Sequence, residues 1–206
     1  MTELFVSAFV TFMVVIDPPG CAPIFAGLTQ GATPVHRRAM AIRSVLIAAG
    51  ILLFFGLLGE DLLRALGISL SAFRIAGGIM LFLIALEMVF ERRTERRENR
   101  AQEVSATEPD DISVFPMAIP MIAGPGSIAS IMLLVGRSDG IDQTLVVFAA
   151  LAAVLLLTLL ALLAAGPLMR LLGHKMEAML TRLLGVILAA LAAQFVIDGI
   201  NRAISV

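Results

Sequence analysis

The sequence contains no tryptophan, no tyrosine, one cysteine and two histidines. A single cysteine cannot form an intrachain disulfide, and no Cys/His spacing typical of a metal site is present. There is also no HExxH motif, nucleophile elbow or phosphate-binding loop, so we expect neither an enzyme nor a bound cofactor or metal. Nucleic acid is not expected as a partner, because no basic face is combined with stacking aromatic residues.

Charged residues are scarce as well, at 15% of the chain, whereas apolar residues make up 59% and the mean hydropathy is +0.99. These values are typical of integral membrane proteins. Six apolar stretches, each about the ~20 residues that a spanning helix needs, cover residues 4–28, 39–58, 73–90, 114–135, 144–163 and 183–200. The sequence therefore predicts an all-α polytopic protein with six transmembrane helices, whose first partner is the lipid bilayer.

Two of these stretches contain helix-breaking residues near their middle. The first break is IDPPGC at residues 16–21, and the second is AGPGS at residues 123–127. Proline removes a helix hydrogen bond and pushes the preceding residue out of the α region, so we expect non-helical backbone at Asp17 and Gly124. Pro19 and Pro125 suit the start of a second half-helix. In a bilayer such breaks are tolerated only where the backbone is buried in protein or lines a cavity.

The breaks belong to a longer internal repeat. Pro19 and Pro125 are 125 − 19 = 106 residues apart, residues 62–67 resemble residues 168–173 at the same offset, and Arg74 matches Arg182 at 182 − 74 = 108. We predict one membrane domain made of a three-helix repeat in residues 1–90, a cytoplasmic Arg-rich linker in residues 91–111 and a second three-helix repeat in residues 112–206. An odd number of spans inverts the second copy, and inverted repeats with broken helices are typical of transporters.

Basic residues predict how the chain crosses the membrane. The positive-inside rule places the loops richest in Lys and Arg in the cytoplasm and both termini outside. The predicted cytoplasmic loops carry Arg37, Arg38, Arg43, Arg92, Arg93, Arg96, Arg97, Arg100, Arg170, Lys175 and Arg182. The opposite side carries only Arg64, Arg74, Arg137 and Arg202.

The breaks supply the candidate substrate-binding residues, which are Asp17, Gly20, Cys21, Gly124, Gly126 and Ser127. Helix starts carry free amides and a partial positive charge, so the amides of residues 20–22 and 126–128 are expected to bind an anion such as a substrate carboxylate. An ionisable group near mid-membrane usually lies on an ion or substrate path, so Asp17 is expected to carry a proton, bind Na⁺ or receive an ammonium group. The alternative interpretations are that Asp17 only caps the second half-helix and that the glycines serve close helix packing. Cys21 fits a small packing residue better than a nucleophile.

Arg74, Arg182 and Glu87 are the candidates for gating or ion coupling. The two arginines begin the third and sixth spans at opposite sides of the membrane, where snorkelling to the interface is the ordinary interpretation. The functional alternative is a gate or a partner for Asp17. Glu87 lies near a helix end and fits an interfacial residue as well.

Three segments carry a family resemblance. DPPG at residues 17–20, FRIAGGI at residues 73–79 and PMAIPMIAGPGSI at residues 116–128 together resemble the MarC family of bacterial and archaeal inner-membrane proteins. The resemblance covers essentially the whole chain and implies a six-helix architecture related to the LysE-type exporters, located in the inner membrane. Some relatives are described as transporters of small neutral amino acids such as glycine and alanine. Cys21 stands where the family leads us to expect a small polar residue such as asparagine.

We therefore expect a secondary transporter of small neutral amino acids that works by alternating access at a mid-membrane site, coupled to H⁺ or Na⁺. Two alternatives stay open. An exporter of metabolites or drugs would share the architecture with a larger, more apolar cavity, and a membrane scaffold would tolerate substitution of Asp17, Gly20 and Gly126. The sequence predicts no oligomeric state.

Overall fold

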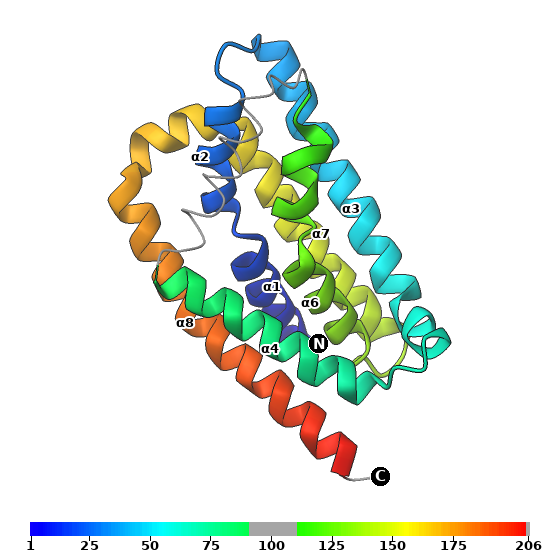
Figure 1. The fold of residues 1–206 in the computed structure, drawn as a ribbon. Coiled ribbons are helices and arrows are strands. Elements are labelled where there is room, and N and C mark those ends of the chain that lie inside the picture. Colours follow the sequence, from blue (N-terminus) through cyan, green and yellow to red (C-terminus); the bar gives the residue numbers. More distant parts are fainter. Residues whose placement is uncertain (91–110, 205–206) are drawn as a thin grey trace.

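The computed structural model describes residues 1–90 and 111–204, except for the side chains of residues 166–178 and 180. Over these ranges the regular elements are helical and lie side by side in one bundle (Figure 1). They are α1 (Thr2–Ile16), α2 (Pro18–Leu28), α3 (Pro34–Ala65), α4 (Leu70–Val89), η1 (Ser113–Ile122), α6 (Pro125–Val135), α7 (Ile141–Leu163) and α8 (Ala165–Ile204). Five helical stretches are long and apolar enough to cross a membrane, and η1 with α6 makes a sixth. The predicted all-α polytopic fold is confirmed.

The first broken helix is more buried than the unbroken spans. In the most apolar part of the stretch formed by α1 and α2, 56% of the residues are buried, against 28–39% in the four unbroken candidates. Figure 1 shows this pair of half-helices between α3 and α7 on one side and α4 and α8 on the other. The outer helices direct large apolar side chains such as Leu53, Leu83 and Leu160 away from the core, as a lipid-facing surface requires.

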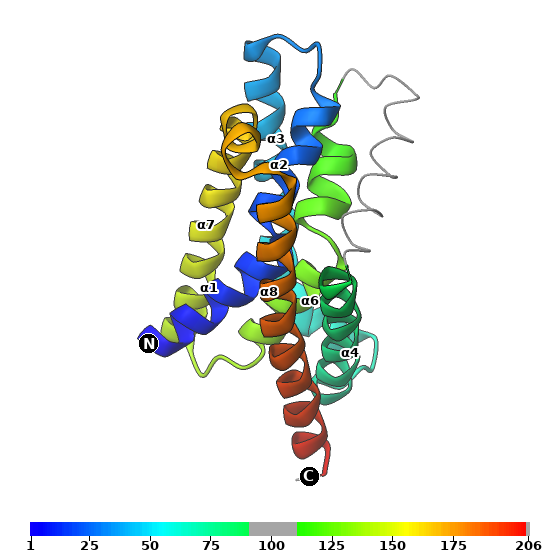
Figure 2. The same ribbon diagram turned by 90° about the vertical axis from the view of Figure 1, so that its left-hand side faces the viewer.

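Corresponding helices of the two halves run in opposite directions. A methyl group added at Gly199 of α8 would lie 3.1 Å from Arg74 Cβ of α4, and one added at Gly185 would lie 2.9 Å from Met88 Cβ. The start of α4 therefore packs against the end of α8, and glycine lets the two backbones approach closely. The helices α3 and α7 are also antiparallel, as Figure 2 shows. This is the arrangement expected of two inverted three-helix repeats.

The last helix is longer than predicted. The sequence pattern predicts a span at residues 183–200 preceded by a loop, whereas α8 is one helix from Ala165 to Ile204. Pro167 lies in its first turn, where proline fits a helix, and no proline follows it to end the helix early. Polarity marks where an apolar span ends, but it does not mark where a helix ends. The predicted linker at residues 91–111 lies outside the described residues except for Asp111.

Candidate functional site

The first break is formed at a single residue in an unusual conformation. Asp17 ends α1 and precedes α2 with φ 58° and ψ 65°, the left-handed region that Asp and Asn adopt more readily than other side chains. Its amide donates to Met13 O at 3.1 Å, and its carbonyl accepts from the Cys21 amide at 3.0 Å. The predicted non-helical backbone at Asp17 is confirmed.

The Asp17 carboxylate caps the helix that follows. Oδ1 accepts the Gly20 amide at 3.2 Å, and the side chain is 3% exposed. A methyl group at Gly20 would overlap Asp17 Oδ2, so glycine makes room for this carboxylate. Free amides were expected at residues 20–22, but the amides of Gly20 and Cys21 are both bonded to Asp17, so that expectation is wrong for these two. The chain's own carboxylate occupies the position that an external anion would take.

Cys21 closes the other side of the same break. Its Sγ donates to Ile16 O at 3.4 Å, and the side chain is fully buried. Ile16 is the last residue of α1, so its carbonyl is one of those that a helix end leaves without an intrahelical partner. The thiol thus acts as a hydrogen-bond donor, as a small polar side chain would. This agrees with the interpretation of Cys21 as a packing residue, and ligand binding by it stays a prediction.

The second break is wider and is built differently. The axes of η1 and α6 differ by 52° across it. In η1 the backbone is extended at Phe115 and Ile119, each of which precedes a proline. Gly124 is also extended, with φ −79° and ψ 172°, and a methyl group there would overlap Pro120 O. The predicted non-helical backbone at Gly124 is confirmed.

No side chain caps α6, in contrast to α2. The Ile128 amide donates to Gly124 O at 3.0 Å, so it is not available to a ligand. The amides of Gly126 and Ser127 form no hydrogen bond with any part of the chain that the structure describes. Ser127 is 2% exposed, and Ser130, one turn later, is fully buried. Of the two predicted anion sites, only this one retains unpaired helix-start amides.

The two breaks lie next to each other. A methyl group added at Gly126 would lie 2.6 Å from Ile84 Cδ1 and 3.1 Å from Val15 Cγ1. Val15 is two residues before Asp17, so the end of α1 packs directly on the start of α6. The end of the first half-helix thus meets the start of α6, and a meeting of the two helix starts at Pro19 and Pro125 near mid-membrane stays a prediction. Gly126 also serves close helix packing, which was its alternative interpretation.

Arg74 does not snorkel. It is the largest fully buried side chain of the described part, and its Nη2 donates to Gly136 O at 2.5 Å. Gly136 follows the last residue of α6, so the guanidinium binds the carbonyl end of that helix, where the dipole favours a cation. Its Nε has no hydrogen-bond partner within the described residues. The predicted snorkelling of the Arg74 side chain is wrong, because tertiary contacts with α6 and α8 enclose it.

A group of polar residues around Arg74 was not predicted from the sequence. Arg137 forms an ion pair with Asp198, and Gln194 Nε2 donates to the other oxygen of Asp198 at 2.8 Å. The Arg137 guanidinium also lies 5.2 Å from the centre of the Phe195 ring. We call Arg74, Arg137, Gln194 and Asp198 the Arg74 cluster. Because 61 residues separate Arg137 from Asp198, no local pattern could have identified the pair.

The other two gating candidates lie elsewhere. Arg182 is exposed on α8, and its interfacial position stays a prediction. Glu87 is half-buried on α4, three residues beyond Ile84, which contacts Gly126. Arg74 and Arg182 match in the sequence repeat, but the structure places them in different environments, the first buried and the second exposed.

A second polar group lies at the other end of α3, where the linker ends. Arg43 forms an ion pair with Asp111 at 2.7 Å, and the Ser113 amide donates to Asp111 Oδ1 at 2.8 Å. The Ser113 hydrogen bonds, followed by that of Arg43, lower the pKa of Asp111 below its ordinary value against a smaller effect of burial. Ser113 Oγ also donates to Met40 O at 3.3 Å. These bonds hold the start of η1 against α3.

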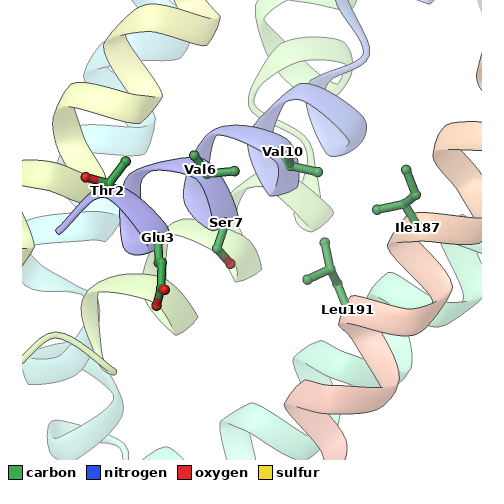
Figure 3. Close-up of a pocket in the computed structure, with 7 residues that line it drawn as sticks. All are labelled: Thr2, Glu3, Val6, Ser7, Val10, Ile187 and Leu191. Atoms are coloured by element: carbon green, nitrogen blue, oxygen red, sulfur yellow. The ribbon is translucent and has the colours of Figure 1, made fainter.

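An open groove lies between α1 and α8. It has a volume of about 480 Å³ and is lined by Thr2, Glu3, Val6, Ser7, Val10, Ile187 and Leu191. In Figure 3, Ile187 and Leu191 extend from α8 toward α1. The lining is mostly apolar with one carboxylate, that of Glu3, which was not among the predicted site residues. No group of three or more metal-ligating side chains occurs among the described residues.

The family follows from a comparison with known sequences. Residues 2–204 match the model of the MarC family, described as integral membrane proteins. The chain belongs to the MarC family. This MarC protein is a multi-pass membrane protein, and the resemblance of residues 17–20, 73–79 and 116–128 is confirmed.

Relatives from archaea and bacteria align along nearly their full length. The UPF0056 membrane protein MJ1677 of Methanocaldococcus jannaschii is 38% identical over 202 residues, with 98% of both chains covered. The UPF0056 inner membrane protein YhgN of Escherichia coli is 36% identical over 206 residues, again with 98% of both chains covered. The UPF0056 membrane protein YvbG of Bacillus subtilis is 33% identical, with 98% of this chain and 96% of that protein covered. No solved structure matches this chain.

Proposed function

We propose that this MarC protein is a secondary transporter of small zwitterionic solutes, with glycine and alanine as the first candidates. The observation that carries the proposal is the contact between two oppositely directed broken helices, through Val15 and Gly126. One break presents a buried carboxylate and the other presents two unpaired amides and a serine. These are the groups that recognise an ammonium and a carboxylate, respectively.

The proposed binding mode is asymmetric. The solute carboxylate would bind the Gly126 and Ser127 amides at the positive end of α6, and its ammonium group would face Asp17. Coupling to H⁺ or Na⁺ would act through the same aspartate, because an ionisable group within a span marks an ion path. Alternating access would arise as one repeat rocks against the other. Apart from a coupling H⁺ or Na⁺, the protein would act without a cofactor or metal, and it would catalyse no covalent reaction.

The location and topology are part of the proposal. A relative from Escherichia coli is named an inner membrane protein, and the basic loops favour cytoplasmic placement of the α2–α3 turn. We propose the inner membrane with both termini outside. A reporter enzyme that works only in the cytoplasm can be fused after Val206. Activity of this fusion would contradict the topology.

The direct test is transport by the purified protein in liposomes. We expect counterflow: liposomes loaded with an excess of unlabelled glycine or alanine should take up the same solute in labelled form. An imposed H⁺ or Na⁺ gradient should accelerate the uptake. A panel of larger amino acids and unrelated solutes defines the selectivity. Absence of counterflow for every small amino acid would contradict the proposal, and uptake that is indifferent to both ion gradients would contradict the coupling.

A second candidate function rests on the groove between α1 and α8. Its volume of about 480 Å³ and its apolar lining with a single carboxylate suit an amphiphilic cation better than glycine. This favours export of a larger metabolite. The variant Glu3→Gln separates the two candidates. Reduced efflux of an amphiphilic cation together with unchanged glycine uptake would identify an exporter that uses this groove. A membrane scaffold would show no transport of either class.

A further inference from the structure

One buried hydroxyl group in α6 lacks a hydrogen bond. Ser130 is fully buried, and its Oγ has no partner within the residues that the structure describes. Nearly all buried polar groups in proteins are hydrogen-bonded, because an unpaired one bears the full cost of losing water. The Ser130 hydroxyl therefore requires an explanation, and a partner from outside the chain is one.

Other buried hydroxyl groups of the bundle are bonded to nearby backbone. Each of four donates to the carbonyl four residues before it, at 2.7–2.8 Å, and these are Thr11, Thr29, Ser44 and Thr158. The same bond from Ser130 would go to Gly126 O, and it is not formed. Ser130 thus keeps its donor available, although its own helix offers an acceptor.

Ser130 lies one turn after the unpaired amides at the start of α6. The amides of Gly126 and Ser127 form no hydrogen bond with the part of the chain that the structure describes. Side chains on a helix tilt toward its N-terminus, and residues three or four apart share a face. The Ser130 hydroxyl is therefore directed at the turn that holds these two amides. At 3.6 residues per turn, Ser127 and Ser130 are about 60° apart around the helix axis.

The polar side of α6 faces the first broken helix. Leu133 packs on α4, because a methyl group at Gly77 would lie 3.0 Å from Leu133 Cδ1. Ile131 packs on α3, where a methyl group at Gly56 would lie 2.9 Å from Ile131 Cγ1. The helical period places the two serines between these apolar sides. On that side Val15 of α1 packs on the start of α6, so the Ser130 hydroxyl lies between the two breaks.

The three donors favour an anion over a cation. The start of α6 carries a partial positive charge, which repels Na⁺ even where a hydroxyl oxygen could bind it. The oxygens of an ionised carboxylate only accept hydrogen bonds, and each can accept more than one. Two amides and one hydroxyl therefore form a donor set that matches a single carboxylate.

We propose that Ser130 is a substrate-binding residue, whose hydroxyl donates to the carboxylate of the solute bound at the Gly126 and Ser127 amides. Such a bond is charge-assisted and stronger than a bond between two neutral groups. The inference rests on the proposed transport function for the identity of the solute. It adds that a buried hydroxyl makes the site select a carboxylate over an uncharged group.

The experiment measures binding to the purified protein in detergent. The thermal unfolding midpoint is followed against ligand concentration at constant ionic strength, which yields a Kd for each probe. The probes are glycine, acetate, which has the carboxylate alone, and glycinamide, in which an uncharged amide replaces the carboxylate. In Ser130→Ala the Kd values of glycine and acetate should rise by at least about tenfold, because one hydrogen bond to a charged group is lost. The Kd of glycinamide should change much less, so the preference for glycine over glycinamide should fall.

Ser44→Ala is the matched control. Ser44 is as fully buried as Ser130, but it lies in α3 and its hydroxyl donates to Met40 O at 2.8 Å. This variant should leave all three Kd values unchanged and should be less stable than the wild type without ligand. Ser130→Ala should be at least as stable as the wild type, because it removes an unpaired hydroxyl and no hydrogen bond. A loss of stability in Ser130→Ala as large as that in Ser44→Ala would show a partner within the chain and would overturn the proposal.

The remaining outcomes separate the role of Ser130 from the proposed function. Wild-type affinity for glycine and acetate in Ser130→Ala would overturn the role of Ser130 and leave the transport proposal untouched. Equal weakening of all three probes would overturn it too, because the effect would then be structural. Acetate binding that depends on Ser130, without binding of any amino acid, would support the anion site and contradict the proposed solutes. A wild-type protein that binds none of the probes would overturn both.

Discussion

The two breaks answer the same physical problem in different ways. At the first, Asp17 takes a left-handed conformation and caps α2 with its own carboxylate, while Cys21 donates to the carbonyl of Ile16. At the second, Gly124 is extended, α6 has no side-chain cap, and the chain bends by 52°. A break whose backbone amides bond to the chain's own carboxylate can hold that charge in the core. A break whose amides are unpaired can accept the charge of an external anion. The two breaks stand at matching places in the sequence repeat, and they differ in the groups that satisfy the backbone.

The largest expected effect concerns the charge of Asp17. Asn adopts the left-handed region and caps helices about as well as Asp, so Asp17→Asn should keep the fold within about 0.5 kcal/mol of the wild type. Transport should fall by at least about tenfold if the carboxylate carries the ion or the ammonium. Uptake in liposomes and thermal unfolding in detergent measure the two effects.

A matched control for this variant is Asp142→Asn, which removes an exposed carboxylate from the first turn of α7. It should leave uptake unchanged. Full uptake by Asp17→Asn would mean that the first break is purely structural, and the comparison between an acidic and an anion-binding break would fail.

The next effect tests how closely the breaks are packed together. Gly126→Ala places a methyl group 2.6 Å from Ile84 Cδ1 and 3.1 Å from Val15 Cγ1. We expect a loss of about 1–3 kcal/mol of stability, as for other overpacked cores. Ile84→Val shortens the side chain that is in the way, so the double variant should recover part of the loss. Strict additivity of the two single effects would show that Gly126 and Ile84 do not constrain each other.

A smaller effect is expected at the corresponding glycine of the first break. Gly20→Ala should displace the Asp17 carboxylate that the added methyl group would overlap, at a cost of about 1–2 kcal/mol for the lost cap. In an Asp17→Ala background the same substitution should cost little, since no carboxylate remains to be displaced. An undiminished cost there, measured by thermal unfolding, would place the constraint in the backbone instead.

The smallest effect lies away from both breaks, at the start of η1. The pKa of Asp111 is lowered in the folded protein, so ionised Asp111 stabilises the fold at pH values above the ordinary pKa of a carboxyl group. This contribution is lost as the pH falls through the lowered pKa. Because the side chain is 38% exposed, we expect at most about 0.5 kcal/mol. Asp111→Asn should remove the corresponding pH dependence below about pH 4. An identical acid transition in the variant would show that another carboxyl group is responsible.

Much of the site was accessible from local pattern. Proline chemistry predicted the non-helical backbone at Asp17 and Gly124, and an odd-numbered repeat predicted that the two breaks would meet. The amides were predicted only in part, because the sequence does not say whether a nearby carboxylate will bond to them. Arg74 was misplaced, since snorkelling is the rule for an arginine near a helix start and only the packing of α6 and α8 encloses it.

The sequence by itself determined the membrane class, the six spans and the two breaks, because hydropathy and proline act through the residues closest to them. Tertiary structure alone decided that Arg74 is buried and that Arg137 meets Asp198. These outcomes depend on which side chains come within a few ångströms of each other across 60 or more residues of chain. Arg74 and Arg182 match in the sequence repeat, and only packing made the first buried and the second exposed.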